Sequence, residues 1–316
     1  MEECFGSDEA LLYLSTKSKA DSFTAHKVLR STAAPDGGMF MPMQIPVQDD
    51  YALDRFERMS FGETVATVLN LFFGTNLSGW DVDFTVGRQA VELATMGHKV
   101  SVAELWHNPA GSRDYFVQRL YQLVLGDPVS TRKPNAWFCA AVNIATLFGI
   151  YGKFCRRDVY TFDVAVDTAD LQMLFAVRYA QRMGLPVRKI ILGCMEEDGL
   201  WDFLSYGDYT AAKKERNIGF EALLWLACGY REVERYHVSL EEKVTYRVPM
   251  LPLETFRKGI FPTVVGDARA RNVMENTHEY QMEIDTARAF GALLNYRAKT
   301  GENKTTLMFG NNAPKV

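Results

Sequence analysis

The sequence predicts an α/β protein with a parallel sheet covered by helices on both faces. From residue 99 onward, short β-branched apolar runs alternate with longer segments of helical periodicity, the pattern of a parallel sheet with crossover helices. Residues 136–151 are almost all apolar, which predicts a fully buried helix. The chain has 316 residues, of which 47% are hydrophobic, enough for a large core and two domains.

The first 96 residues predict a small α-rich N-terminal domain. The helix expected at 60–73 begins with Ser60 and Glu63 at capping-box spacing, followed by apolar residues at helical period. The other elements expected here are a strand at 11–14, a helix near 23–31, a Pro-Gly-Gly turn at 34–38 and a helix near 84–94. We place the domain boundary near Met96, which gives domains of residues 1–96 and 97–316.

Strands and helices alternate through the second domain. Gly184 with Pro186, and Gly301, supply helix stop signals. The expected strands are 99–105, 159–166, 187–194 and 305–309, and the expected helices are 114–125, 136–151, 167–182, 220–226, 253–258 and 284–300. Residues 126–134 hold two prolines without periodicity and predict a loop.

Composition excludes several classes of function. The formal net charge of −4 argues against a nucleic-acid-binding protein, and no apolar stretch is long enough to predict a membrane span. The five cysteines have no metal-site or CxxC spacing, and the histidines are scattered, so we expect no metal. We therefore expect a soluble intracellular protein in a reducing compartment, either the cytoplasm or an organelle matrix such as that of the mitochondrion.

One segment resembles a known active-site motif. Residues 104–114 read Glu-Leu-Trp-His-Asn-Pro-Ala-Gly-Ser-Arg-Asp, similar to the E-L-[FW]-H-G-P-[ST]-x-x-[FY]-K-D motif of threonine synthases, but one residue shorter. Seven other short segments resemble that family in the same order, namely residues 13–16, 34–42, 141–147, 179–189, 201–209, 284–288 and 312–316. The resemblance implies a three-layer αβα parallel-sheet core of the fold type II pyridoxal-phosphate (PLP) enzymes.

The chain departs from this family where PLP would bind. The family's lysine forms a Schiff base with PLP, whereas Arg113 stands in its place. A guanidinium stays protonated and offers no free amine, so it cannot replace that nucleophile. The resemblance also implies a mobile small domain with a substrate-binding loop, which is deleted here between about residues 126 and 136.

Two further departures affect cofactor binding. The glycine-rich phosphate loop aligns with a degenerate run formed by Thr168, Ala169, Asp170, Gln172 and Met173. Without glycines the backbone cannot approach a phosphate closely, and Asp170 adds a negative charge at the start of the helix. The position whose hydroxyl contacts the pyridine ring aligns with Gly310. We therefore expect no PLP and no catalytic residues.

These departures favour a pseudoenzyme that acts as a structural or interaction protein, as a subunit of a larger assembly with protein partners. Its residual cleft would include His107, Arg113, Asp114 and Asp170, with Arg113 paired to a carboxylate because an unpaired buried charge is costly. Trp137 and Phe138 are predicted partner contacts, beside the deletion. The alternative is a small-molecule binder or a non-PLP enzyme that uses this cleft. A PLP-dependent lyase acting on O-phosphohomoserine-like substrates is the least favoured reading.

Overall fold

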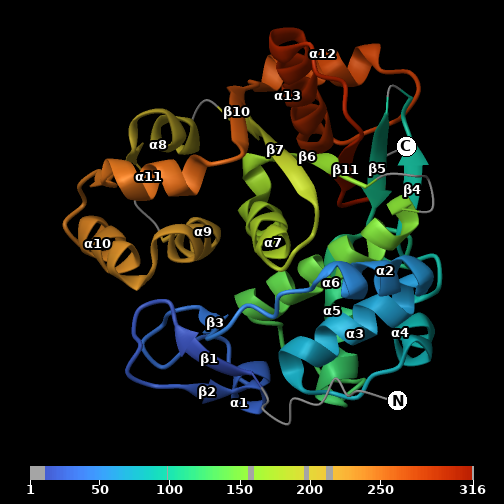
Figure 1. The fold of residues 1–316 in the computed structure, drawn as a ribbon, viewed down its shortest axis with the longest axis vertical. Helices are drawn as coiled ribbons and strands as arrows, with labels where there is room; N and C mark the ends of the chain where they lie inside the picture. The colour runs from blue at the N-terminus through green and yellow to red at the C-terminus, as the bar shows by residue number, and fades with distance from the viewer. Residues whose placement is uncertain (1–10, 98, 156–159, 196–198, 211–215, 315–316) are drawn as a thin grey trace.

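The computed structural model describes residues 11–97, 99–155, 160–195, 199–210 and 216–314. A six-stranded sheet in the order β10-β7-β6-β11-β5-β4 forms its centre (Figure 1). All neighbouring strands are parallel except the edge strand β4, which runs antiparallel to β5. The strands are β4 (Glu92–Thr95), β5 (Val100–Glu104), β6 (Phe162–Asp167), β7 (Val187–Cys194), β10 (Ile260–Val264) and β11 (Thr306–Gly310). The predicted parallel α/β fold is confirmed.

Helices bury both faces of this sheet. In β6, Val164 and Val166 belong to one buried cluster and Ala165 to the other, because successive side chains of a strand point to opposite faces. One face packs against α13 (Ile284–Thr300), and α12 (Asp267–Asn276) packs on α13. The opposite face packs against α7 (Leu171–Arg182), with α6 (Ala136–Cys155) beside α7 and α3 (Phe61–Phe73) packed on α6. No helix in the described part of the chain combines the length and apolar character that a membrane crossing needs.

The N-terminal region contains more sheet than its sequence predicts. The strands β1 (Leu12–Ser15), β2 (Phe23–Thr24) and β3 (Phe40–Pro42) form a small antiparallel sheet, and its helices, besides α3, are α1 (Ala25–Leu29), α2 (Asp50–Arg58) and α4 (Gly79–Val86). The predicted capping box of α3 is confirmed, with Ser60 and Glu63 bonded reciprocally. The helix predicted near 84–94 is wrong. Gly87, at φ +89°, ends α4, and residues Glu92–Thr95 pair with β5 as β4.

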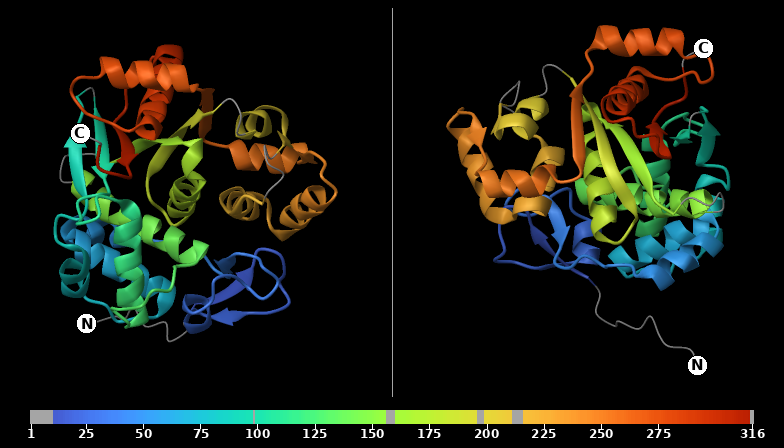
Figure 2. Two further views of the ribbon diagram at one scale, coloured as in Figure 1. Left: turned by 180° about the vertical axis from the view of Figure 1, so that it is seen from behind. Right: turned by 45° about the horizontal axis from the view of Figure 1, so that its top comes forward.

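A helical lobe lies between β7 and β10 along the chain. It consists of α8 (Leu200–Tyr206), β8 (Asp208–Tyr209), α9 (Ile218–Cys228), α10 (Tyr230–Glu241), β9 (Tyr246–Arg247) and α11 (Met250–Arg257). Phe203, Phe220 and Tyr236 are fully buried at its centre. Both views of Figure 2 show this lobe beside the small N-terminal sheet.

A buried carboxylate joins the lobe to the N-terminal sheet. Glu221 of α9 has no exposed surface and accepts hydrogen bonds from the Thr16 hydroxyl and from His237 Nε2 at 2.9 Å. Arg216 donates to both oxygens of Glu221, at 2.6 and 2.8 Å, and also to the carbonyl of Gly37. Burial alone would raise the pKa of Glu221, but these hydrogen bonds outweigh it and lower the pKa to about 2.

The connection between α5 (Arg113–Leu125) and α6 is short. Residues 126–135 join the two helices, and this segment is too short to form a further domain. Trp137 and Phe138, at the start of α6, both have 0% exposure. Their predicted role as partner contacts is therefore wrong. They pack against the aromatic residues Tyr13, Phe72, Phe73, Tyr121 and Tyr179.

Candidate functional site

The carboxyl ends of β5, β6 and β11 bring together residues that are distant in sequence. Arg113 begins α5, just after Ser112, whose side chain caps that helix. The Arg113 side chain, 17% exposed, forms an ion pair with Asp170, 14% exposed, through Nη1 and Oδ2. The backbone N–H of Arg113 donates to the carbonyl of Asn311 at 2.8 Å, and Asn311 Nδ2 donates to the same Asp170 oxygen at 3.2 Å. The structure thus pairs Arg113 with a carboxylate, as its burial requires.

Two carboxylates cap the helix start that follows β6. Asp167 accepts a hydrogen bond from Ala169 N at 2.6 Å and so caps a short 3-10 turn, Thr168–Asp170. Asp170 Oδ1 then accepts from Met173 N at 3.0 Å and caps α7. Aspartate is favourable here because a helix N-terminus presents unpaired N–H groups and a positive dipole end. The same carboxylates occupy N–H groups that an anionic ligand would need.

The remaining residues of the predicted phosphate loop lie in the core, at its edge or on the surface. Met173 is fully buried in the core and Gln172 is half-buried. Thr168 is buried, and its hydroxyl accepts from Met195 N at 3.2 Å. Ala169 is exposed. Residues 168–173 therefore start α7, and the Thr168 hydroxyl joins the end of β6 to the residue that follows β7.

Below this helix start, Asp167 also joins a buried ion-pair network. Its other oxygen pairs with Arg288 of α13, which also donates to Asp267 at 2.6 Å and to the carbonyl of Val265 at 3.1 Å. Burial raises the pKa of Asp167 to about 6 and outweighs the opposing effects of the Ala169 N–H and of Arg288. Gly193 of β7 lets α13 pack this close to the sheet, because a side chain at position 193 would meet the backbone of Arg288.

His107 lies in a hydrogen-bonded group at the end of β5. Its Nε2 is 2.6 Å from Glu104 Oε2, and its ring stacks on Trp106 with the centroids 4.1 Å apart. Tyr280 donates to Glu104 Oε1 at 2.9 Å, and burial, followed by this bond, raises the pKa of Tyr280. Glu92, Glu104 and His107 have ligand atoms within 4.8 Å of one another. These three are the residues of the described chain that stand closest to a metal-binding arrangement.

Gly310 ends β11 beside the same group. A methyl group at this position would lie 3.4 Å from both Trp106 Nε1 and the Tyr280 hydroxyl, so two aromatic side chains already fill the space near the predicted ring-contact position. Asp114, by contrast, is exposed on the first turn of α5. The structure therefore groups Arg113 with Asp170, and His107 with Glu104, while Asp114 takes no part in either pair.

Sequence reasoning missed Asn311, Tyr280 and Arg288 as members of this region. Asn311 had the clearest signal, because it directly follows the last strand, where side chains meet at the carboxyl edge of a parallel sheet. Tyr280 gave no local signal, since it lies 176 residues from the Glu104 that it contacts.

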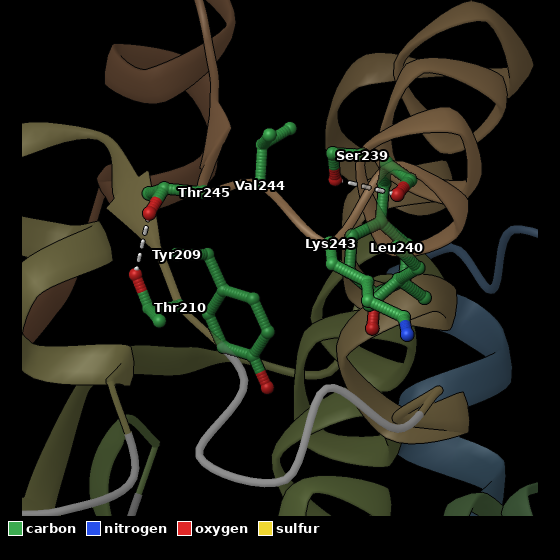
Figure 3. A pocket seen from close by; sticks show the side chains of 8 residues that line it. Tyr209, Thr210, Ser239, Leu240, Lys243, Val244 and Thr245 are labelled. Atoms are coloured by element: carbon green, nitrogen blue, oxygen red, sulfur yellow. Dashed lines mark hydrogen bonds between the residues drawn. The ribbon is translucent and has the colours of Figure 1, made fainter.

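A separate pocket lies in the helical lobe (Figure 3). It has a volume of about 180 Å³ and lies between β8, the end of α10 and β9. Tyr209 points into it, and the Thr210 and Thr245 hydroxyls are 2.9 Å apart at its rim. Lys243 is the one charged residue among the described residues that line it. No described lining residue is an acid, a histidine or a cysteine, so this pocket shows no catalytic pair.

Comparison with known proteins points to one family. A family model described as threonine synthase N terminus matches residues 12–87. Threonine synthase-like 2 of Homo sapiens and of Pongo abelii are each 32% identical to this chain over 104 residues. That match covers 30% of this chain and 22% of each relative, so the chain matches less than a quarter of their length.

Solved threonine synthases have the same fold. PLP-bound threonine synthase from Brucella melitensis superposes with a TM-score of 0.79 at 16% identity, covering 96% of this chain and 89% of that one. The yeast enzyme gives 0.77 at 15% identity, covering 96% and 88%. The N-terminal match and the curated relatives make this chain similar to threonine synthases and threonine synthase-like proteins, and the solved structures show the same fold, as its motifs predict.

Proposed function

We propose that this chain is a threonine synthase-like pseudoenzyme that acts as an interaction subunit of a protein assembly. The observation that carries the first part is the ion pair between Arg113 and Asp170. It fills the two positions that matter most for PLP in the motifs that this chain resembles. One is the place of the Schiff-base lysine, and the other is the helix start that would hold the phosphate.

The residues present do not fit PLP. Arg113 carries no amine lone pair that could attack an aldehyde. Asp170 places a carboxylate on the N-terminus of α7 and uses the Met173 N–H, so a phosphate there would meet a like charge instead of free N–H groups.

The short α5–α6 connection supports the same proposal. Residues 126–135 stand where the resemblance implies a small domain that closes over substrate. Without such a domain, water has access to the region of Arg113, and enzymes of this kind depend on its exclusion.

An exposed aromatic pair supports the interaction role. Trp80 and Phe84 of α4 are 65% and 76% exposed and stack on each other with ring centroids 5.0 Å apart. Large exposed aromatic side chains are enriched at protein interfaces and carry much of their binding energy. They replace Trp137 and Phe138 as the proposed contacts.

The cofactor part is tested by adding PLP, reducing with borohydride and measuring intact mass. We expect no stoichiometric adduct on the wild-type chain, and none at residue 113 in Arg113→Lys, because Asp170 still repels the phosphate. The double variant Arg113→Lys with Asp170→Ser should accept PLP better than the single variant. A stoichiometric single-site adduct on the wild-type chain would show that the pseudoenzyme proposal is wrong.

The interaction part is tested by sedimentation of the tagged chain in extract of its native cells. We expect a particle larger than one chain, and Trp80→Ser with Phe84→Ser should return it to the size of one chain. Tyr160→Ser, which alters another exposed aromatic residue, is the control and should not. If the wild-type chain already sediments alone, the assembly role is refuted.

A small-molecule binder is the second candidate. Trp106 Nε1 and Asn311 Oδ1 are buried and have no hydrogen-bond partner among the described residues. Trp106 Nε1 lies beside Gly310, which Asn311 follows in the chain, and buried polar atoms normally have partners. Native mass spectrometry of the purified chain would reveal a retained molecule, which Asn311→Leu should release.

A further inference from the structure

A cavity at the far end of α7 is lined by three cations. It has a volume of about 290 Å³ and lies between α7, α9, α11 and the start of β10. Arg178 and Arg182 come from the last turns of α7, and Lys258 follows α11. Helix rise places Arg182 about 18 Å from Asp170 along α7, so this cavity is distinct from the Arg113 region.

The part of the chain that the structure describes offers these three cations no carboxylate partner. Among the described residues, no carboxylate oxygen forms an ion pair with Arg178, Arg182 or Lys258. Arg178 and Arg182 also repel each other, and burial first, then the charge of Arg182, lowers the pKa of Arg178. Arg178 is half-buried, whereas Arg182 and Lys258 are exposed at the mouth of the cavity, so the positive charges attract an anion to it.

Donor groups remain available on two of the three side chains. Two nitrogens of the Arg178 guanidinium already have acceptors. They donate to Gln181 and to the carbonyls of Thr255, Phe256 and Lys258. Arg182 uses Nη1 alone, toward the carbonyl of Leu226 at 2.7 Å. The Lys258 ammonium makes no hydrogen bond among the described residues. A guanidinium has five N–H donors and an ammonium three, so both can bind anionic oxygens.

Apart from Gln181 and Thr255, the rest of the cavity wall is apolar. Five side chains from three elements form it, and none has a polar group: Leu223, Leu226, Ala227, Phe256 and Ile260. A bare hydrated anion gains nothing from such a surface, whereas an organic group attached to the anion would bury apolar area against it.

We propose that this cavity binds an amphipathic organic anion, with a phosphate or carboxylate held by Arg182 and Lys258 and a compact apolar group against α9 and α11. Arg178 holds the cavity open by anchoring the end of α11 to α7. The site goes beyond the proposed function and does not depend on it, because no residue of the Arg113 region lines it.

The test compares three probes by isothermal titration calorimetry on the full chain. Phenyl phosphate carries both features, inorganic phosphate carries the anion, and benzyl alcohol carries the apolar group. We expect saturable binding of phenyl phosphate that weakens with added salt, and clearly weaker binding of the other two. Benzoate should also bind if a carboxylate suffices, and its failure would restrict the site to phosphates.

Matched variants locate the binding. Lys258→Met and Arg182→Gln should each weaken phenyl phosphate binding about tenfold, because each removes one charge-assisted contact. Arg257→Gln, which alters an exposed neighbour outside the cavity, should leave it unchanged. Lys258 is exposed, so its variant should fold, and circular dichroism checks this. The proposal is overturned if phenyl phosphate does not bind, if inorganic phosphate binds equally well, or if Arg257→Gln weakens binding as much as Lys258→Met.

Discussion

Replacement of Glu221 by glutamine should strongly destabilise the protein. The carboxylate is fully buried and accepts four hydrogen bonds, from Thr16, His237 and the two donors of Arg216. Glutamine preserves the shape but removes the charge, and its NH₂ group would face donors in place of an acceptor. The partners would then be left partly unsatisfied at the junction of the helical lobe with the N-terminal sheet.

Two lines of reasoning give the size of the effect. Lowering the pKa of this buried carboxyl from 4.5 to about 2 corresponds to about 3 kcal/mol in favour of the ionised form. Removing one partner from a buried ion pair generally costs about 3–5 kcal/mol. For a chain of this size, a loss of 3 kcal/mol should lower the midpoint of thermal unfolding by roughly 5–10 °C.

The contribution of Glu221 should also depend on pH. Its pKa is lower in the folded state than in the unfolded state, so folding is favoured when the group is ionised. The contribution is fully present above pH 4.5 and is lost as the pH falls toward about 2. The difference in stability between the wild type and Glu221→Gln should therefore shrink over this range, and taking the difference cancels the titration of other groups.

Urea unfolding at pH 7 and at stepwise lower pH measures both effects. Glu241→Gln is the matched control, because this residue is exposed at the end of α10 and has no side-chain hydrogen bond among the described residues. We expect it to change the free energy of unfolding by less than about 0.5 kcal/mol. If Glu221→Gln loses less than about 1 kcal/mol, or if its deficit is the same at every pH, the account of this carboxylate is wrong.

Four more substitutions test other parts of the fold by thermal or urea unfolding. Gly184→Ala should lower the free energy of unfolding by over about 2 kcal/mol, because Gly184 has φ +108° and a side chain there would overlap a backbone oxygen. Its control is Gly301→Ala, which has open space around it and should cost about 1 kcal/mol. Equal losses for the two variants would contradict the steric argument. Ser60→Ala should cost about 1 kcal/mol by removing the cap of α3, and no loss would mean that the capping box is not formed in solution. Arg288→Met should cost about 3–5 kcal/mol by leaving a buried carboxylate without its partner, and a neutral result would indicate that this carboxyl is protonated in the folded protein.

Local signals predicted the four central strands of the sheet, β5, β6, β7 and β11. The predicted strand at 187–194 and the helix at 284–300, ended by Gly301, match β7 and α13. These segments combine long apolar periodicity with a clear stop signal. The lobe helix α10 and the outer helix α12 were not predicted. Helix α12 buries only Ala270 and Val273, so its sequence shows little apolar periodicity. Strand β10 was missed because it contains Pro262, which an edge strand tolerates.

The candidate site was predictable in part for similar reasons. The sequence named Arg113 and Asp170 separately, and a buried guanidinium needs a carboxylate, so their pairing was one of a few alternatives. The network of Glu104, Trp106 and Tyr280 depends on a contact between distant segments. Sequence periodicity carries no information about such contacts, because it reports which face of an element is buried and not what covers it.

The ion pair between Arg113 and Asp170 also constrains how this gene can change. The two residues are 57 positions apart but share one interaction, so a substitution that removes the charge of either leaves the opposite charge without its partner. A neutral residue at 113 or a glycine at 170, introduced one at a time, gives a less stable protein. The pair therefore acts as an epistatic barrier, and mutational drift will preserve both residues together more readily than it will change either one alone.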